Sequence, residues 1–401
     1  MKTAILLPVA AVTMLHAGSP ASIAINPAPE PKWLVPTLDA RLRYEFSNVE
    51  GFDDSHALTL RARPGLKTAE WHGFSALAEG EFTGAIIDDY NGGAPGAHPF
   101  ELGKSVVADP QGAELNQAFL KYHGYDATMI LGRQRIIYNN AAFIGNSGWR
   151  QNEQTFDAAS VSYEADYGFK ASYAWVGQVN RIFGAQADGA FAAVDTNVHL
   201  INASYSGFKN VTLGSYIYLM DFKDTAVTGW DNDTYGIFLD TPIGGIKTHA
   251  EFAFQDGAGP LNNKQALYFH INTAKEFQGF TIMGGIEQLD SGFQTPLATL
   301  HTMDGFADTT DGLRANGTAG GLTDNYISLT APLPWELKWT NVVHFFGDNS
   351  IGTQFGFGLD SLLVKKFNAH FSATAMLGYF ESNDVRYLSA TKASIQLDYT
   401  F

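Results

Sequence analysis

The last ten residues of the chain, KASIQLDYTF (392–401), alternate without a break between apolar and polar side chains. Successive residues of an extended strand point to opposite faces, so this period of two predicts a strand whose faces meet unlike surroundings. The two faces are Ala393, Ile395, Leu397, Tyr399 and Phe401 on one side, and Lys392, Ser394, Gln396, Asp398 and Thr400 on the other. A strand of this kind needs an apolar environment along one face and water along the other.

The same period recurs along the chain from Thr37 onward, for example in LDARLRYEF (38–46), FKASYAWVGQ (169–178) and IKTHAEFAFQ (246–255). Helical periodicity is scarce over these residues. Short turns and longer polar loops alternate between the predicted strands. Short turns are expected at 67–73, 123–126, 164–168, 206–210, 241–245, 275–279, 331–334 and 364–368.

Among the longer loops, 84–113, 138–155 and 289–324 are rich in Gly or polar residues. Strands of about ten residues, joined by short turns on one side and long loops on the other, are typical of barrels in the bacterial outer membrane. We therefore expect residues 37–401 to form an all-β, membrane-spanning, antiparallel up-and-down β-barrel of about 18 strands, with short periplasmic turns and long extracellular loops. Loops 84–113 and 289–324 are long enough to fold into the lumen.

Both ends of the chain fit this localisation. Residues 1–24 have a basic start, a short apolar run and small residues, and they predict a secretory signal peptide. The Pro-rich residues 25–36 predict a periplasmic lead-in. The C-terminal Phe401 resembles the signal that barrel-assembly machinery recognises. The other expected partners are outer-membrane lipids and lipopolysaccharide, and the expected form is a monomer.

Composition excludes several classes of function. The net charge of −16 argues against binding of nucleic acid, which needs a basic surface, and the absence of cysteine excludes disulfides and thiolate metal sites. No motif of a common hydrolase, metalloprotease or nucleotide-binding enzyme is present, so we expect no enzyme, no cofactor and no metal site. The 11 histidines are scattered in the sequence. His249 and His344 lie on polar strand faces, where a hydrogen-bonded lumenal histidine is the favoured interpretation.

An Arg-x-Arg pattern occurs three times, at 41–43, 61–63 and 133–135. Residues two apart on a strand share a face, and an arginine facing lipid near the midplane costs about 2–4 kcal/mol. All three pairs are therefore expected to point into the lumen. For the third pair this assignment sends Gln134 outward, which costs less than two outward arginines.

These side chains predict a basic track along one wall, which would guide anions through the pore. The predicted pore-lining residues are Arg41, Arg43, Arg61, Arg63, Lys121, Arg133, Arg135, Arg150 and Lys170. The alternative is that the arginines pair with lumenal acids and fill the interior. The acids considered for this role are Asp39, Glu45, Glu79 and Glu81.

A family resemblance rests on residues 132–157. The positions that carry it are Gly132-Arg133-Gln134, Trp149-Arg150 and Thr155-Phe156-Asp157, together with RLRYEF (41–46), LTLRARPG (58–65) and the terminal QLDYTF (396–401). In these positions the chain resembles the alginate-export family of outer-membrane barrels, although the specific motifs are confined to about its first half. The resemblance implies an 18-stranded channel lined by Arg and Lys, of a kind in which at least one member passes an anionic polysaccharide outward.

The expected function is a passive channel for anionic or polar solutes, anionic oligosaccharides or polysaccharides included. The alternative within transport is a general or carbohydrate-specific porin, which a stacked aromatic ladder on the lumenal face would favour. An outer-membrane barrel enzyme or an adhesin is the alternative from another class. A Ser/His/Asp cluster at the outer rim would favour the enzyme.

Overall fold

The structure is a computed structural model that describes residues 33–258, 263–299, 305, 308–310, 313, 320–349 and 352–401. The predicted signal peptide and all of the lead-in before Trp33 lie outside the described residues. The first half of the described chain forms the strands β1 (Leu34–Val49), β2 (Ser55–Thr68), β3 (Phe74–Asp89), β4 (Gly112–Gly124), β5 (Ala127–Gln134), β6 (Thr155–Glu164), β7 (Phe169–Asn180), β8 (Ala193–Phe208) and β9 (Val211–Met220).

The second half forms the strands β10 (Asn232–Ile243), β11 (Ile246–Ala258), β12 (Lys264–Phe277), β13 (Phe280–Leu289), β14 (Leu322–Leu333), β15 (Leu337–Gly347), β16 (Gln354–Lys366), β17 (Phe371–Ser382) and β18 (Ala390–Thr400). Three short 3-10 helices lie among the described residues: η1 (Gly189–Phe191), η2 (Thr228–Trp230) and η4 (Pro334–Glu336). In the described part of the chain, no helix is long and apolar enough to span a membrane.

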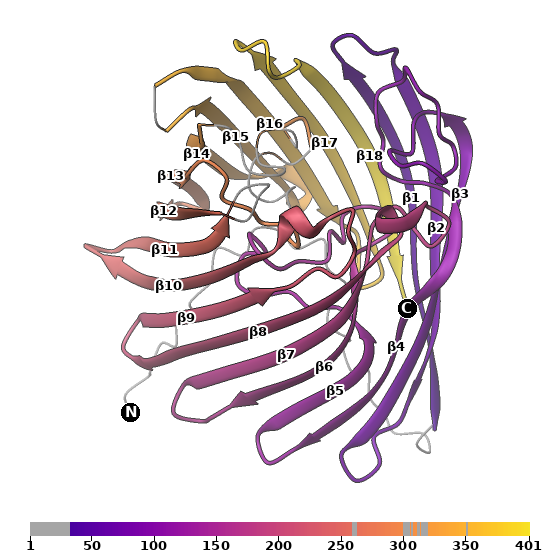
Figure 1. Cartoon of the computed structure of the whole chain (residues 1–401), viewed down its shortest axis with the longest axis vertical. Helices are drawn as coiled ribbons and strands as arrows, with labels where there is room; N and C mark the ends of the chain where they lie inside the picture. Colours follow the sequence, from indigo (N-terminus) through magenta and orange to yellow (C-terminus); the bar gives the residue numbers. More distant parts are fainter. Residues whose placement is uncertain are drawn as a thin grey trace.

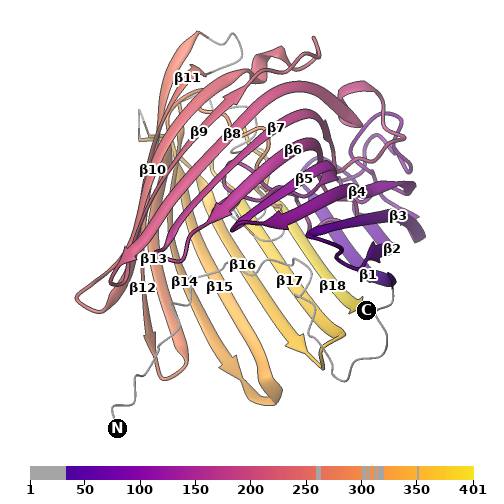
Figure 2. The same ribbon diagram turned by 90° about the horizontal axis from the view of Figure 1, so that it is seen from below.

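The 18 strands form one closed antiparallel sheet in which every strand pairs with its neighbours in sequence. β18 pairs with β1 in a register that runs from Asp39 opposite Thr400 to Val49 opposite Ala390, and this seam closes the ring. Figure 1 shows irregular segments within the ring of strands, and Figure 2 shows β1 and β18 side by side near the C-terminus. The predicted fold class and the alternation of short turns with long loops are confirmed.

Side chains alternate between the two faces of the wall as the period-two pattern predicts. In β18, Lys392, Ser394 and Gln396 are buried on the inner face, whereas Ile395 and Leu397 are exposed on the outer face. The outer face carries large apolar side chains from all around the ring, among them Leu60, Phe82, Leu131, Ile237, Phe252, Ile327 and Ile395. The apolar core of the molecule lies inside the barrel, where loop residues pack against β6 to β9, β12 and neighbouring strands.

Candidate functional site

The arginines of β1 and β2 lie on the inner face of the wall. The two strands pair with Arg41 opposite Arg61 and Asp39 opposite Arg63, which groups the charged side chains. The four arginines, Arg41, Arg43, Arg61 and Arg63, are at most 4% exposed. Leu42, between Arg41 and Arg43, and Leu60, next to Arg61, are exposed on the outer face. The inward direction predicted for the first two Arg-x-Arg pairs is therefore confirmed.

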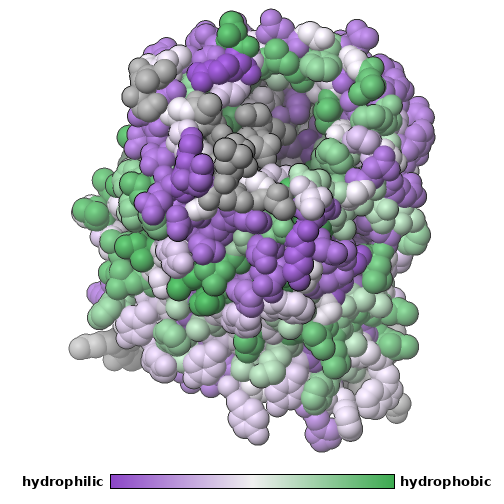
Figure 3. All heavy atoms as spheres, viewed as in Figure 1, coloured by the Kyte–Doolittle hydropathy of each residue, from purple (hydrophilic) through white to green (hydrophobic). Residues whose placement is uncertain are grey.

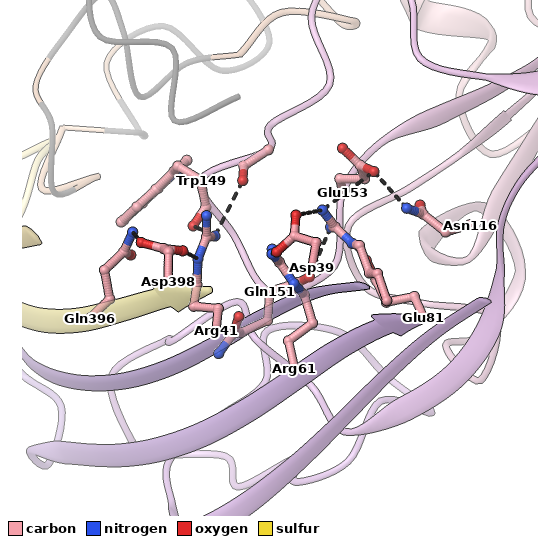
Figure 4. A network of polar contacts seen from close by, with 12 residues as sticks. Asp39, Arg41, Arg61, Glu81, Asn116, Trp149, Gln151, Glu153, Gln396 and Asp398 are labelled. Carbon is pink, nitrogen blue, oxygen red and sulfur yellow. Dashed lines mark hydrogen bonds and ion pairs between the residues drawn. The ribbon is translucent and has the colours of Figure 1, made fainter. Parts of the chain in front are cut away.

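Each of these arginines forms ion pairs with carboxylates inside the barrel, and Figure 4 labels Arg41 and Arg61 with their partners Asp398 and Asp39. The Nε of Arg41 lies 2.7 Å from Oδ1 of Asp398 on β18, and Arg61 pairs with Asp39. Arg63 pairs with several acids, and Arg43 pairs with two. Their partners are Asp39, Glu81 and Glu153 for Arg63, and Glu45 and Asp109 for Arg43.

The segment 135–154, between β5 and β6, folds into the lumen. Its residue Arg150 lies 3.3 Å from Glu45 on β1 and 2.5 Å from Asp308, and the Trp149 carbonyl accepts hydrogen bonds from Arg41 at 2.7 Å and from Arg43 at 2.8 Å. Two guanidinium groups contact the Trp149 ring, with that of Arg43 4.0 Å and that of Arg150 4.3 Å from the ring centroid. Cations over an indole face are attracted by its quadrupole, so this end of the segment is fixed to the β1 wall.

The other end of the same segment packs against the opposite part of the ring. Phe143 contacts aromatic side chains of the wall and of the segment after β13, with ring centroids 5.1 to 6.2 Å apart. These partners are Tyr216 and Tyr218 of β9, Tyr268 of β12, and Phe293. We call residues 135–154 the crossing loop, because it contacts walls on both sides of the lumen.

Two further loops brace the crossing loop. From the segment that follows β13, the Leu297 carbonyl accepts a hydrogen bond of 2.8 Å from the Gly145 amide. From the segment between β3 and β4, Asp109 accepts one of 2.8 Å from the Gln151 amide through its Oδ1. Loops 84–113 and 289–324 were both expected to be long enough to enter the lumen, and parts of both thus lie inside it. The crossing loop, which was not singled out for this role, contacts both.

The third Arg-x-Arg pair does not share a face, which corrects the prediction. Gln134 is 2% exposed and lies inside, opposite the buried Phe156 in the register of β5 and β6. Arg133 lies on the outer face in line with the exposed Met129 and Leu131, at the loop end of β5.

Arg133 is neutralised there by Asp157, with Nε 2.6 Å from Oδ1. Arg135 follows the end of β5 and turns inward, where its Nε donates a 2.6 Å hydrogen bond to Glu153 and its Nη2 a 3.2 Å bond to Glu79. The reason for the split is that the strand ends at Gln134, so alternation no longer governs residue 135.

Glu153 joins the crossing loop to the arginine cluster, as Figure 4 shows. Burial alone would raise the pKa of this carboxyl, but the neighbouring Arg135 and Arg63 outweigh burial and hold its pKa well below the usual range. Asn116 also donates a 2.7 Å hydrogen bond to it. The carboxylate is therefore charged at neutral pH and forms ion pairs with the guanidinium groups of Arg63 and Arg135.

The two predicted lysines lie outside this cluster. Lys121 stands opposite Ser75 and Ile130 toward the short-turn end of the barrel. Lys170 is exposed at that rim and forms an ion pair with Glu164. Of the predicted pore-lining residues, six lie together inside the barrel: Arg41, Arg43, Arg61, Arg63, Arg135 and Arg150.

Acids and histidines line the wall opposite the arginine cluster. In register across four strands, Glu251 of β11 faces His270 of β12, then Glu287 of β13 and Asp324 of β14. On β15, His344 places its Nδ1 2.7 Å from Oδ2 of Asp324. Sequence reasoning placed His249 and His344 on polar faces but did not find this row, because strands far apart in sequence supply its members.

The fold and the interior together define a class of protein, the 18-stranded β-barrel of the bacterial outer membrane, with an apolar outer face and a polar interior partly filled by loops. No family model and no curated protein matches the sequence. Among solved structures the chain is similar to Pseudomonas aeruginosa OpdO, at 10% identity and a TM-score of 0.70, over 92% of this chain and 98% of that chain.

The chain is also similar to Pseudomonas aeruginosa OccK8 (OprE), with 12% identity and a TM-score of 0.68 over 93% of this chain and 99% of that chain. Acinetobacter baumannii OccAB3 gives 12% identity and a TM-score of 0.69 over 92% of this chain and 99% of that one. At these identities the likeness establishes the fold. The resemblance to the alginate-export family stays a prediction.

Proposed function

We propose that the protein is a passive porin of the outer membrane that admits small polar solutes. The observation that carries the proposal is the crossing loop, which narrows a polar lumen and is held on one side by Arg150 and on the other by Phe143. A barrel of this size without inward loops would leave a wide aqueous channel. A narrowed, polar interior supports selection by size and by hydrogen bonding.

The charge balance of the interior favours a general polar solute over an anion. The six arginines of the cluster face eight carboxylates within ion-pair distance: Asp39, Glu45, Glu79, Glu81, Asp109, Glu153, Asp308 and Asp398. This arrangement agrees with the alternative hypothesis, in which the arginines pair with lumenal acids instead of forming an open basic track. All four acids considered for that pairing, Asp39, Glu45, Glu79 and Glu81, are among the eight. Paired and buried guanidinium groups leave little free positive charge to attract an anion.

Among the described residues, the stacked tyrosines of β9 are covered and so are not an open ladder for sugars. Tyr216 and Tyr218 stack with ring centroids 4.8 Å apart, but both are at most 2% exposed, because Phe143 of the crossing loop covers them. Their role in this conformation is to hold the loop. A general porin for small polar solutes therefore agrees with the interior better than a carbohydrate-specific porin or an exporter of an anionic polymer.

The test is conductance of the full mature chain in planar bilayers, combined with swelling of liposomes in neutral sugars of increasing size. We expect discrete conductance steps, uptake of small sugars with a sharp size limit, and reversal potentials in a salt gradient that show no anion selectivity. Absence of any conductance from a correctly folded barrel would overturn the channel proposal. Strong anion selectivity would instead support the basic-track hypothesis.

A further inference from the structure

Two histidines and a glutamate come together on the inner face of β11 and β12. His249 and Glu251 are two residues apart on β11 and share its inner face, and His270 lies directly opposite Glu251 in the register with β12. One ligand-type atom from each of the three side chains can be chosen so that all lie within 4.8 Å of one another. Twenty residues of sequence separate His249 from His270, so only strand pairing unites them.

Neighbouring side chains orient the members of this cluster. The Nδ1 of His249 lies 2.8 Å from Oδ1 of Asp240 on β10, and its Nε2 faces Oε2 of Glu251 at 3.4 Å. A carboxylate on one ring nitrogen of a histidine is the usual outer partner when the other nitrogen binds a metal, because it fixes the tautomer and the ring direction. Tyr216 donates a 2.6 Å hydrogen bond to Oε1 of Glu251, which fixes the carboxylate in turn.

We propose that His249, Glu251 and His270 form a binding site for a divalent transition-metal ion such as Zn²⁺ in the channel wall. Imidazole and carboxylate ligands suit Zn²⁺, Cu²⁺ and Ni²⁺, whereas Ca²⁺ and Mg²⁺ prefer a shell made wholly of oxygen. Ligands at about 2.0–2.2 Å from a tetrahedral zinc ion lie roughly 3.3–3.6 Å apart, so small side-chain rotations suffice to close the site.

Three protein ligands leave a coordination position for water or for a group of a passing solute. The His249 side chain is 21% exposed, so an ion in the lumen can reach the cluster. Asp240, Glu251 and the adjacent Glu287 also give this part of the wall a negative charge that attracts a cation. The competing arrangement is a protonated His249 held between Asp240 and Glu251, with no affinity for metal.

The site is tested on the full chain folded in detergent, where binding does not depend on conductance. Calorimetric titration with Zn²⁺ is expected to give one strong site, which a large excess of Mg²⁺ does not displace. The variants His249→Asn, Glu251→Gln and His270→Asn should each weaken binding at least about tenfold, because loss of an outer partner of a ligand alone costs about 10–100-fold in metal affinity. His123→Asn is the matched control, because His123 is exposed at a short turn and its loss should change nothing.

Equal affinity in all four variants, or no binding by the folded wild type, would overturn the proposal. Heat-modifiable electrophoretic mobility shows whether each variant is folded. X-ray absorption on the wild-type complex provides a readout that needs no variant, with two imidazole nitrogens and at least one oxygen expected at about 2.0–2.2 Å from zinc. A shell with fewer than two imidazoles contradicts the assignment even if zinc binds.

Discussion

Arg133 and Arg135 are two residues apart in sequence and contact opposite sides of the barrel wall. The guanidinium of Arg133 pairs with Asp157 on the outer face, whereas that of Arg135 pairs with Glu153 and Glu79 inside. The wall between them is a single strand end. Arg133 therefore faces the outside of the barrel and Arg135 its interior. Because only Arg135 contributes to the charge of the lumen, variants of the two residues can be compared to measure the effect of that charge.

Arg135→Ala should shift the channel toward cations, because Glu79 and Glu153 then lose a neutralising partner. A unit charge acting over about 8 Å of water contributes roughly 0.5 kcal/mol to the energy of a cation and the opposite amount to that of an anion. Together these changes correspond to about a fivefold change in the cation-to-anion permeability ratio. Reversal potentials in a salt gradient measure this ratio. Arg133→Ala is the control and should leave the ratio unchanged. An equal shift in both variants would show that the two side chains do not lie on opposite faces.

Trp149→Ala should loosen the crossing loop and raise both the conductance and the noise of the open channel. The indole is 6% exposed, contacts the guanidinium groups of Arg43 and Arg150, and packs on Leu362 and Met376. Truncation of a buried tryptophan to alanine costs about 3–5 kcal/mol. Single-channel recordings measure both the conductance and the noise of the open channel. Trp335→Ala, at an 82% exposed position in a short turn, is the control, and an effect of similar size there would refute the local explanation.

Glu153→Gln should lower the free energy of unfolding of the barrel at neutral pH by on the order of 3 kcal/mol, because the buried arginines lose a charged partner. The melting temperature should fall with it. Because the pKa of Glu153 in the folded protein lies below the ordinary 4.5, its contribution is complete above that value and is lost as the pH falls toward the folded pKa. The difference in melting temperature between wild type and variant should therefore shrink below about pH 4.5.

The control for this experiment is Glu336→Gln, because the side chain of Glu336 is 89% exposed in η4. The melting temperature of the Glu336→Gln variant should match that of the wild type from neutral to acidic pH. A difference for Glu153→Gln that stays constant as the pH falls would contradict a charged, paired Glu153.

Gly132→Ala should reduce the yield of folded barrel severalfold. Gly132 has a φ of +125°, and a β-carbon at this position would lie 2.3 Å from the carbonyl oxygen of Ala118 on β4. The strained conformation and the collision act together against pairing of β4 with β5. Gly84→Ala is the control, since nothing lies within 4 Å of an added β-carbon there. Heat-modifiable mobility quantifies the folded fraction, and equal yields would contradict the steric argument.

The fold was predictable from sequence because every strand repeats one physical requirement, an apolar face against lipid and a polar face against the interior. Alternation alone placed Arg41, Arg43, Arg61 and Arg63 correctly, because their strands continue well beyond them on both sides. The assignment failed at Arg133, which faces outward, and at Gln134, which faces inward, because β5 ends at Gln134 and Arg135 turns inward without following the strand. Periodicity contains no signal for the residue at which a strand ends inside a polar segment.

The crossing loop and the histidine cluster were harder to predict for a different reason. Apolar residues such as Ile136, Phe143 and Ile144 in a presumed extracellular loop were the available signal, because their exposure to water is unfavourable. The meeting of His249 with His270 depends on the register between β11 and β12. A shift of one residue would send one histidine to the lipid face, and composition cannot fix that register.

The Arg41 side chain connects three parts of the protein that come together at one place. From β1 it bonds to Asp398 of the last strand and, through the carbonyl of Trp149, to the crossing loop. The same guanidinium thus stabilises the seam between β1 and β18 and the position of the crossing loop in the lumen. Closing the cylinder and narrowing its passage are consequently coupled steps of assembly. We expect a barrel in which β1 and β18 are not paired to have a wider pore as well as an open sheet.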